Sequence, residues 1–395
     1  MFFYKKLIFF CFVYIFTYIM YMATRIFSDI IKRSNRSILK KITINDMIKS
    51  QNINHYNRSK LVHYDIKNRL CHQILCLENM PFGLGQLHHI QKIADWYIKS
   101  YKELEEYENN NTFNNNERHN TLLQAILDRH STTFSNMSKG IFEWKKALDK
   151  RYGNTKNFFD STDTNIIINK IDDALDIFYK NRTSIRIIIN HHLNMHNNDN
   201  NNGNVGSVNL SVNPIECMAD GWEEAKIISE REYGICPQIY INSKDENLYN
   251  KFIKKYEYLS IPYISIHMKN IYFEIFKNSI RGLIDRYGDE AENPENGINV
   301  YFSDKKAHNF DIKINDNGIG INRLCMDKIW SYFYTTAPNN IICEESMDHI
   351  DFSGIGPMAG LGYGLPITRL MIRYFGGDIR INSIENVGTD TYLHF

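Results

Sequence analysis

The chain has 395 residues, of which 43% are hydrophobic and 23% are charged. This is an ordinary globular composition, and the length is sufficient for two domains. A formal net charge of +1 argues against nucleic acid as a partner, because nucleic-acid-binding surfaces need an excess of Lys and Arg. The seven cysteines form no Cys-x-x-Cys pair and frame no zinc site, so we expect mostly buried, reduced thiols.

Residues 1–45 have the composition of a targeting segment. Residues 7–23 are uncharged and rich in Phe, Tyr and Ile, and Lys5 and Lys6 precede them. The stretch that follows, up to residue 45, contains several Lys and Arg residues but a single acidic residue, Asp29. We therefore predict an organelle-targeting presequence over 1–45, with a membrane anchor through residues 7–23 as the alternative.

Residues 46–196 are predicted to form an N-terminal four-helix bundle. Apolar residues recur every three to four positions over 87–104 and 165–178, and helices are also expected over 121–129 and 136–152. Residues 181–192 suit a helix or a strand. An asparagine-rich run at 197–204 cannot bury enough apolar surface to order itself, so it marks the boundary to a second domain at 205–395.

The second domain combines short strands with helices. Strands are predicted over 298–302, 310–315, 378–384 and 389–395, and helices over 266–286 and 365–375. Phe310, Ile312 and Ile314 alternate with polar residues, as one buried face of a sheet requires. The fold class is therefore α+β with two domains, in which the second is an α/β sandwich with mixed strand order.

Three motifs in this domain carry chemistry. On the predicted helix, polar residues recur at three- and four-residue spacing opposite an apolar stripe, which puts a potential base beside a neutral Mg²⁺ ligand. They are Glu274, Lys277, Asn278, Arg281 and Asp285.

The second motif is Asp316, which follows a strand directly and precedes Gly318 and Gly320. The two glycines predict a sharp turn, and the carboxylate can accept a hydrogen bond from an exocyclic amine such as that of adenine. The third motif is Gly360, Gly362 and Gly364, which lead into a helix through Leu365 and Pro366. Backbone N–H groups at such a helix start bind anions, and 339–364 would form a mobile lid.

In this order the motifs resemble the GHKL ATPase fold of histidine kinases, gyrase-type ATPases and mitochondrial protein kinases. The segments 273–281, 330–338 and 359–370 are similar to the pyruvate dehydrogenase kinase family, and so are 374–378 and 388–390. The helical half agrees, since Asn79-Met80-Pro81, Trp96-Tyr97, 100–104, Arg129-His130, Lys139-Gly140 and 182–192 also resemble that family.

The resemblance implies an ATP- and Mg²⁺-dependent protein-serine kinase. Its substrate would be the E1α subunit of a mitochondrial 2-oxoacid dehydrogenase, with pyruvate dehydrogenase favoured and the branched-chain enzyme as the alternative, and phosphorylation would inactivate it. The E2 lipoyl domain, a homodimer and the mitochondrial matrix are also implied; a plastid is the other destination. The remaining alternatives are a histidine kinase that uses His130, His191 or His192, and a non-catalytic regulator.

Residue by residue, the resemblance implies that Glu274 is the general base and Asn278 the Mg²⁺ ligand. Asp316 would contact adenine, with Gly318 and Gly320 shaping that wall. The other nucleotide-binding positions implied are Lys277, Arg281, Thr335, Thr336, Gly360, Gly362, Gly364, Leu365 and Thr389.

Two features depart from the family pattern. Several members place a His four residues before the base, where this chain has Asn270, and His267 lies seven before it. Asn can orient a carboxylate but cannot share its proton. The chain also reaches Phe395 without the longer C-terminal tail of many members, which weakens the expectation of lipoyl-domain docking.

Overall fold

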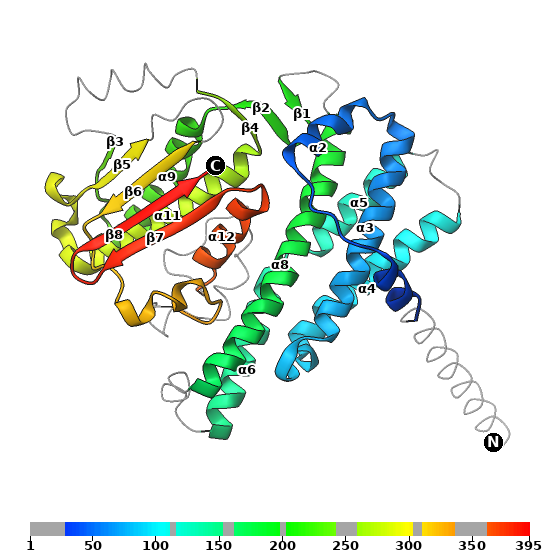
Figure 1. Ribbon diagram of the computed structural model, residues 1–395, viewed down its shortest axis with the longest axis horizontal. Coiled ribbons are helices and arrows are strands. Elements are labelled where there is room, and N and C mark those ends of the chain that lie inside the picture. Colours follow the sequence, from blue (N-terminus) through cyan, green and yellow to red (C-terminus); the bar gives the residue numbers. More distant parts are fainter. Residues whose placement is uncertain are drawn as a thin grey trace, which may run out of the picture.

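The computed structural model describes residues 28–110, 116–152, 162–197, 203–241, 259–302, 310–335 and 362–395. A helical half and a half built on a β-sheet lie side by side (Figure 1). The expected α+β fold class, with helices first and an α/β sheet domain second, is therefore confirmed.

The helical half consists of long helices that pack along one another. The cap of the first long helix is Asn54, whose side chain accepts a hydrogen bond from the Asn57 backbone N–H. In chain order the elements are α2 (Ile44–Lys49), η1 (Ser50–Asn52), α3 (His55–Glu78), η2 (Pro81–Gln86), α4 (His88–Asn109), α5 (Asn116–Arg129), α6 (Thr133–Tyr152) and α8 (Thr162–Asn197).

Helix α8 resolves the ambiguity over residues 181–192, which are helical. Phe178, Ile185 and Ile189 are buried at spacings of seven and four residues, so they form one apolar stripe on this helix. Helix α3 was not predicted individually. Its buried residues include His63, Lys67, Arg69 and Gln73, and these polar side chains obscure its periodicity.

The second half is a five-stranded sheet with helices on one face (Figure 1). The strand order is β3-β5-β6-β8-β7, in which β3 and β5 are parallel and the other neighbours are antiparallel. The strands are β3 (Ile239–Ile241), β5 (Ile298–Phe302), β6 (Asp311–Asp316), β7 (Asp378–Ile384) and β8 (Gly388–His394), and the helices are α9 (Pro214–Tyr233), α11 (Ser265–Tyr287) and α12 (Gly364–Tyr374).

Smaller elements complete this half. A second sheet has the order β1-β2-β4 and lies between the main sheet and the bundle (Figure 1). Its strands are β1 (Asn204–Val205), β2 (Val208–Val212) and β4 (Ile261–Tyr263), and the 3₁₀ turns are η3 (Gly288–Glu292), η4 (Pro294–Asn296), η5 (Arg323–Cys325) and η6 (Lys328–Trp330).

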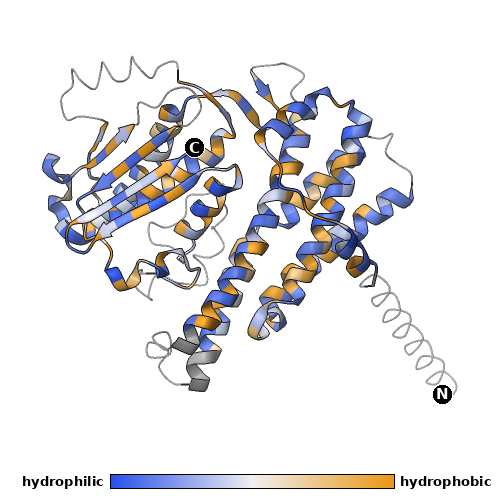
Figure 2. Cartoon of the chain, in the orientation of Figure 1, coloured by the Kyte–Doolittle hydropathy of each residue, from blue (hydrophilic) through white to orange (hydrophobic). Residues whose placement is uncertain are grey.

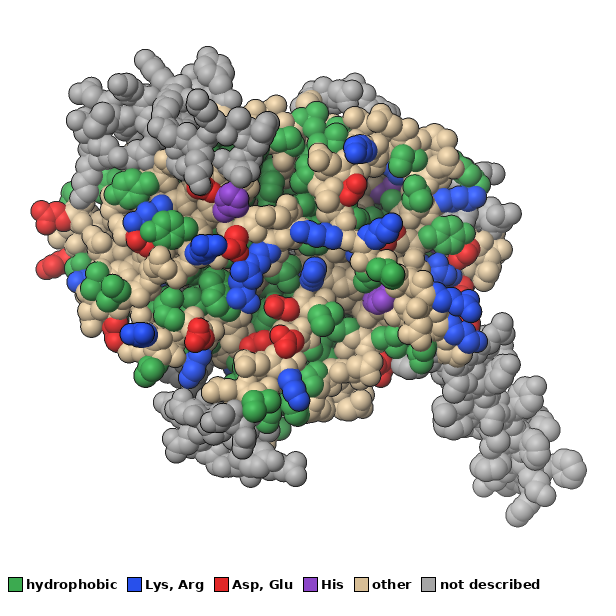
Figure 3. All heavy atoms as spheres, in the orientation of Figure 1, with side chains coloured by type: hydrophobic (Ala, Val, Ile, Leu, Met, Phe, Trp, Pro, Cys, Tyr) green, Lys and Arg blue, Asp and Glu red, His purple; other side chains and the backbone are tan. Residues whose placement is uncertain are grey.

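Each of the four predicted strands is present, with ends that differ by at most one residue. Phe310, Ile312 and Ile314 are buried, which confirms the alternation expected from the sequence. Figure 2 shows apolar and polar residues alternating along the strands and around the helices, as amphipathic elements require. On the face shown in Figure 3, acidic and basic side chains are interspersed rather than gathered by sign.

Residues 28–45 differ from the expectation that set 1–45 apart from the fold. Residues 28–36 are helical, and Ile30 is fully buried in the main core. The Arg69 guanidinium donates to the Lys40 carbonyl (2.7 Å), and Lys41 Nζ donates to the Arg373 carbonyl (3.2 Å), so this segment joins α3 to the end of α12. We call residues 28–45 the N-terminal strap.

The predicted apolar stretch 7–23 lies outside the described residues. Among the residues that the structure does describe, none of the helices is both long enough and apolar enough to cross a bilayer. The domain limits 46–196 and 205–395 stay a prediction; residues 198–202 of the asparagine-rich run between them are also outside the described part.

Candidate functional site

Helix α11 supplies the polar face of the candidate site. Its apolar stripe, which includes Ile271, Ile280 and Leu283, is buried against the sheet and α9. The opposite face turns Glu274, Lys277, Asn278, Arg281 and Asp285 toward a cavity of about 400 Å³, a size typical of small-molecule sites. The predicted helix face therefore lines one common cavity.

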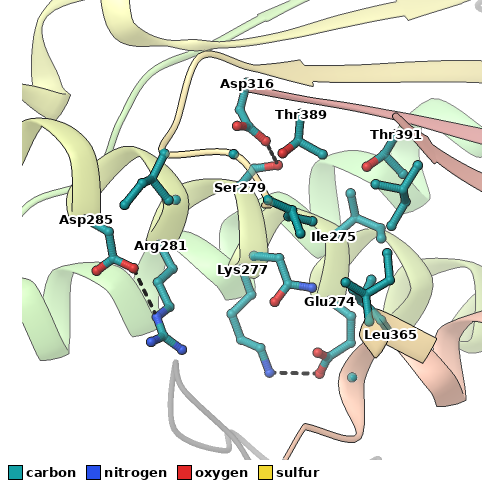
Figure 4. A pocket seen from close by; sticks show the side chains of 18 of the residues that line it. Glu274, Ile275, Lys277, Ser279, Arg281, Asp285, Asp316, Leu365, Thr389 and Thr391 are labelled. Carbon is teal, nitrogen blue, oxygen red and sulfur yellow. Dashed lines mark hydrogen bonds and ion pairs between the residues drawn. The ribbon is translucent and has the colours of Figure 1, made fainter. Parts of the chain in front are cut away.

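Glu274 and Lys277 lie together at one end of this cavity (Figure 4). Lys277 Nζ is 2.9 Å from Glu274 Oε1, and their side chains are 11% and 20% exposed. On its other side the carboxylate approaches the start of α12 so closely that a Cβ at Gly364 would overlap Glu274 Oε2. A carboxylate beside the N-terminus of a helix is in a favourable position, so Lys277 and the start of α12 both help to orient this side chain.

Asp316 lies at the opposite end of the cavity, with Thr389 beside it (Figure 4). It ends β6 and accepts hydrogen bonds from Ser279 Oγ (2.8 Å) and from the Gly318 backbone N–H (3.0 Å). Burial raises the pKa of this carboxyl from 3.8 to about 6, although these hydrogen bonds act in the opposite direction. A buried carboxylate with a side exposed to a cavity is suited to accept a hydrogen bond from a ligand.

Gly318 allows the turn after β6 to contact α11 directly. A Cβ at this position would lie 2.6 Å from the carbonyl carbon of Gly282 and 2.7 Å from its oxygen. The Ile319 N–H donates to the same Gly282 carbonyl at 2.8 Å. Backbone therefore packs on backbone here, which only glycine permits, and the contact fixes Asp316 against Ser279.

Most of the predicted site residues line this cavity. They are Glu274, Lys277, Asn278, Arg281, Asp316, Gly320, Thr335, Gly362, Gly364, Leu365 and Thr389. Gly318 stands behind Asp316 and is not in the lining. Thr336 and Gly360, and most of the predicted lid at 339–364, lie outside the described residues.

Several residues of the lining were not predicted from the sequence. Among them are Ser279, Tyr334 and Thr391, together with Ile319, Ile321, Asn322, Ile329, Ile381 and Glu385. Ser279 lies five residues after Glu274 on α11, and a polar residue beside the apolar stripe was the signal that could have revealed it.

The three histidines considered as phosphoacceptors are buried in the helical half. His130 is 2% exposed, with its Nε2 3.0 Å from Ser100 Oγ and its ring stacked on Tyr97. Burial lowers the pKa of His130 to about 3. His191 and His192 are 6% and 1% exposed, and none of the three is among the described residues that line the cavity.

Asn270, which stands where several family members have a histidine, and the nearby His267 are not part of this lining either. They lie one and two turns before Glu274 on α11. Lys277 Nζ donates a hydrogen bond to the Glu274 carboxylate.

Comparisons with known proteins agree with this site. Residues 264–395 match the family described as "Histidine kinase-, DNA gyrase B-, and HSP90-like ATPase". Residues 41–209 match the family described as "Mitochondrial branched-chain alpha-ketoacid dehydrogenase kinase". The cavity residues of α11, β6, α12 and β8 all fall in the first of these matches.

Relatives that match over most of the chain are named as the same kind of kinase. The mitochondrial [pyruvate dehydrogenase (acetyl-transferring)] kinase of Arabidopsis thaliana is 30% identical over 336 residues, which is 85% of this chain and 83% of the relative. Isozyme 3 of the same kinase from Mus musculus is 30% identical over 331 residues, or 82% of this chain and 73% of the relative. The chain therefore belongs to the pyruvate dehydrogenase kinase family, whose members are protein kinases with a GHKL ATP-binding domain.

Proposed function

We propose that this chain transfers the γ-phosphoryl group of ATP to a serine hydroxyl on the E1α subunit of a pyruvate dehydrogenase complex, and thereby inactivates that complex. The observation that carries the proposal is that one cavity has Asp316 at one end and Glu274 at the other. An adenine bound at Asp316 would direct its phosphates toward Lys277 and Glu274.

Binding depends on both ends of the cavity. At the Asp316 end the ionised carboxylate would accept from the exocyclic amine of adenine, while Thr389 completes that wall. Toward the other end, Lys277 and Arg281 would offset phosphate charge, and the free N–H groups at the start of α12 would add to this. Phosphoryl transfer needs mainly such positioning and charge neutralisation.

Glu274 is the proposed general base. Its Oε1 is held by Lys277, which leaves Oε2 to accept the proton of the serine hydroxyl as that oxygen attacks. Gly364, which has no side chain, keeps the approach to Oε2 open. The proton that leaves the serine would reside on Glu274 until the products depart.

The cavity also fits Mg²⁺ bound together with nucleotide. Asn278 offers a neutral amide oxygen, and no group of three or more His, Cys, Asp or Glu suited to a metal occurs within the part of the chain that the structure describes. Mg²⁺ is often held by few protein ligands and by substrate phosphates. When bound, it would neutralise charge on those phosphates.

The other expected partners belong to the same proposal. The relatives named above are mitochondrial, which supports the matrix as the location rather than a plastid or a membrane. A homodimer and docking to the E2 lipoyl domain remain proposals from the family resemblance. The relatives' names favour pyruvate dehydrogenase over the branched-chain enzyme, and the buried histidines disfavour a histidine kinase.

The test is phosphorylation of purified E1α subunits with Mg-ATP labelled at the γ-phosphate. We expect acid-stable phosphoserine on pyruvate dehydrogenase E1α, and a Glu274→Gln variant should lose about 100- to 10,000-fold in kcat while it still binds ATP. Glu290→Gln, an exposed change on η3, is the matched control and should behave as wild type. Equal activity of the Glu274 variant would refute the assigned base; label on the branched-chain subunit alone would reassign the substrate.

A further inference from the structure

One wall of the cavity is held by the helical bundle. Residues 330–335 run from the bundle surface to the cavity: Tyr332 and Phe333 are buried, and the next residues, Tyr334 and Thr335, line the cavity. In Figure 1 the lower parts of α6 and α8 lie beside the sheet domain, and α12 contacts α8 directly. The residues that form this wall of the cavity therefore follow directly on residues that pack against the helical half.

Two carboxylates of α8 bind Tyr332 at separate atoms. Its backbone N–H donates to Asp172 Oδ1 (3.0 Å), and its hydroxyl donates to Asp176 Oδ1 (2.7 Å). The Tyr332 ring also stacks on Tyr179 of α8, with ring centroids 5.3 Å apart. Three contacts to one helix fix the position and the rotation of Tyr332, and so the direction in which the chain continues to Tyr334.

Helix α6 holds the same segment from a second side. Lys145 Nζ donates to the Phe333 carbonyl (3.0 Å), and the Trp144 ring lies 5.8 Å from the Phe333 ring. On the other border of the cavity, the Tyr363 ring packs on Phe134 of α6, with centroids 5.0 Å apart. The residues that follow Tyr363, Gly364 and Leu365, line the cavity.

Asp176 links the segment to α12 as well. Its Oδ2 lies 4.0 Å from the Arg369 guanidinium, which stacks over the Trp330 ring at 4.7 Å. One carboxylate of the bundle therefore touches both Tyr332 and the helix whose N-terminus faces Glu274. A shift of α8 along its axis would move both.

Burying the Asp172 carboxylate has a desolvation penalty, so packing alone does not explain an Asp at this position. Burial raises its pKa to about 6, while the Tyr332 N–H and the Ser331 side chain hydrogen-bond to it and lower the pKa. A partly desolvated carboxylate adds little stability compared with an apolar residue of similar size. Its hydrogen bond does fix the direction of the Tyr332 backbone N–H. An apolar residue could fill the same space but could not orient the backbone in this way.

We propose that Asp172 and Asp176 are positioning residues for the nucleotide site: through Tyr332 and Arg369 they set the cavity wall at Tyr334 and the start of α12. Nucleotide affinity then depends on where α8 lies. By reciprocity, nucleotide binding restrains α8, so a ligand or partner that displaces this helix weakens ATP binding. The proposal rests on the proposed function, because it requires that the cavity binds ATP.

The test measures nucleotide affinity in variants outside the cavity. Asp172→Ala, Asp176→Ala and Tyr332→Phe should each raise the calorimetric Kd for Mg-ATP about five- to tenfold, as expected for one lost hydrogen bond. Asp173→Ala, an exposed change on the same turn of α8, should bind as wild type. Far-UV circular dichroism and the urea midpoint of each variant show whether it is folded.

Hydrogen exchange distinguishes a positioning role from a purely structural one, because only the former predicts that ATP changes amide exchange in α8. ATP should slow amide exchange around residues 172–176 in the wild type, and Tyr332→Phe should abolish that slowing while the variant stays folded. Wild-type affinity in all three variants, or no ATP effect on α8 exchange, would overturn this inference alone. Failure of the wild type to bind ATP would overturn the proposed function and this inference with it.

Discussion

Asp316→Asn keeps the shape of a buried side chain and removes its charge. In the wild type the Asp316 carboxylate accepts from Ser279 Oγ and the Gly318 N–H. An Asn can place its oxygen toward Gly318 and donate its NH₂ to Ser279 Oγ, so the fold need not change. The variant should bind ATP more weakly than the wild type and yet be more stable at neutral pH.

The magnitude follows from the pKa of the wild-type carboxyl. Burial raises that pKa from 3.8 to about 6, so the folded protein holds this proton more tightly than the unfolded chain does. The corresponding stability is present in full below pH 3.8 and is lost as the pH rises through about 6. About 2 pH units correspond to about 3 kcal/mol. The hydrogen bonds from Ser279 and Gly318 are already included in this pKa, so about 3 kcal/mol is the net cost of the charge.

The assay is urea denaturation of both proteins between pH 4 and 8. The free energy of unfolding of Asp316→Asn should exceed that of the wild type by about 3 kcal/mol at pH 7.5, and the two curves should converge as the pH falls toward about 4. Asp289→Asn, an exposed change on η3, serves as the control and should follow the wild type at every pH.

Calorimetry tests the other half of the prediction. A lost hydrogen bond to a charged acceptor should weaken Mg-ATP binding by about 10- to 100-fold. Parallel stability curves for wild type and variant would refute the account of Asp316 as a desolvated carboxylate. Unchanged ATP affinity would refute its assignment to the adenine.

Three further predictions concern packing, charge and acid. Gly318→Ala should lower the urea-derived stability by about 1 to 3 kcal/mol, because the new Cβ meets the Gly282 backbone at 2.6 and 2.7 Å. Lys277→Met should raise the Kd for Mg-ATP about tenfold, measured by calorimetry, since a cation next to the phosphates is lost. Burial lowers the pKa values of His119 and His192 to about 3, so unfolding takes up protons below pH 6.5 and stability falls as the pH decreases. Each histidine contributes about 1.4 kcal/mol of destabilisation per pH unit below this value. Urea denaturation at pH 7.5 and 5.5 should therefore show that a His192→Leu variant loses less stability on acidification than the wild type does.

The sequence revealed those elements whose pattern is local. The strand at 311–316 alternates cleanly, and the polar face of α11 repeats at three- and four-residue spacing, so both were predictable from neighbours along the chain. Helix α3 was not found individually, because it buries Lys67 and Arg69 among its apolar residues. Those cations are tolerated because Glu108 of α4 pairs with Lys67 and Asp65 pairs with Arg69 one turn away on α3 itself. The pairing between α3 and α4 cannot be seen from one segment of sequence.

The site divides in the same way. Glu274, Asn278 and Asp316 stand in recognisable local motifs. Thr391 reaches the cavity because β8 pairs with β6, and Tyr334 reaches it because Tyr332 is held by α8. Neither arrangement follows from the spacing of residues along the chain. The clamp of Tyr332 by the carboxylates of α8 joins residues more than 150 positions apart, with sequence separations of 160 and 156, so only the structure could reveal it.

The N-terminal strap sets a limit on proteolytic maturation. A cut near residue 45, where the targeting segment was expected to end, would remove Ile30 from the main core. It would also take away the Lys40 carbonyl that accepts from Arg69, whose guanidinium is 3% exposed, and the tie between Lys41 and the end of α12. We therefore expect any cut that leaves a stable kinase to fall before Ile30, so a mature N-terminus located by mass spectrometry should lie on the N-terminal side of Ile30.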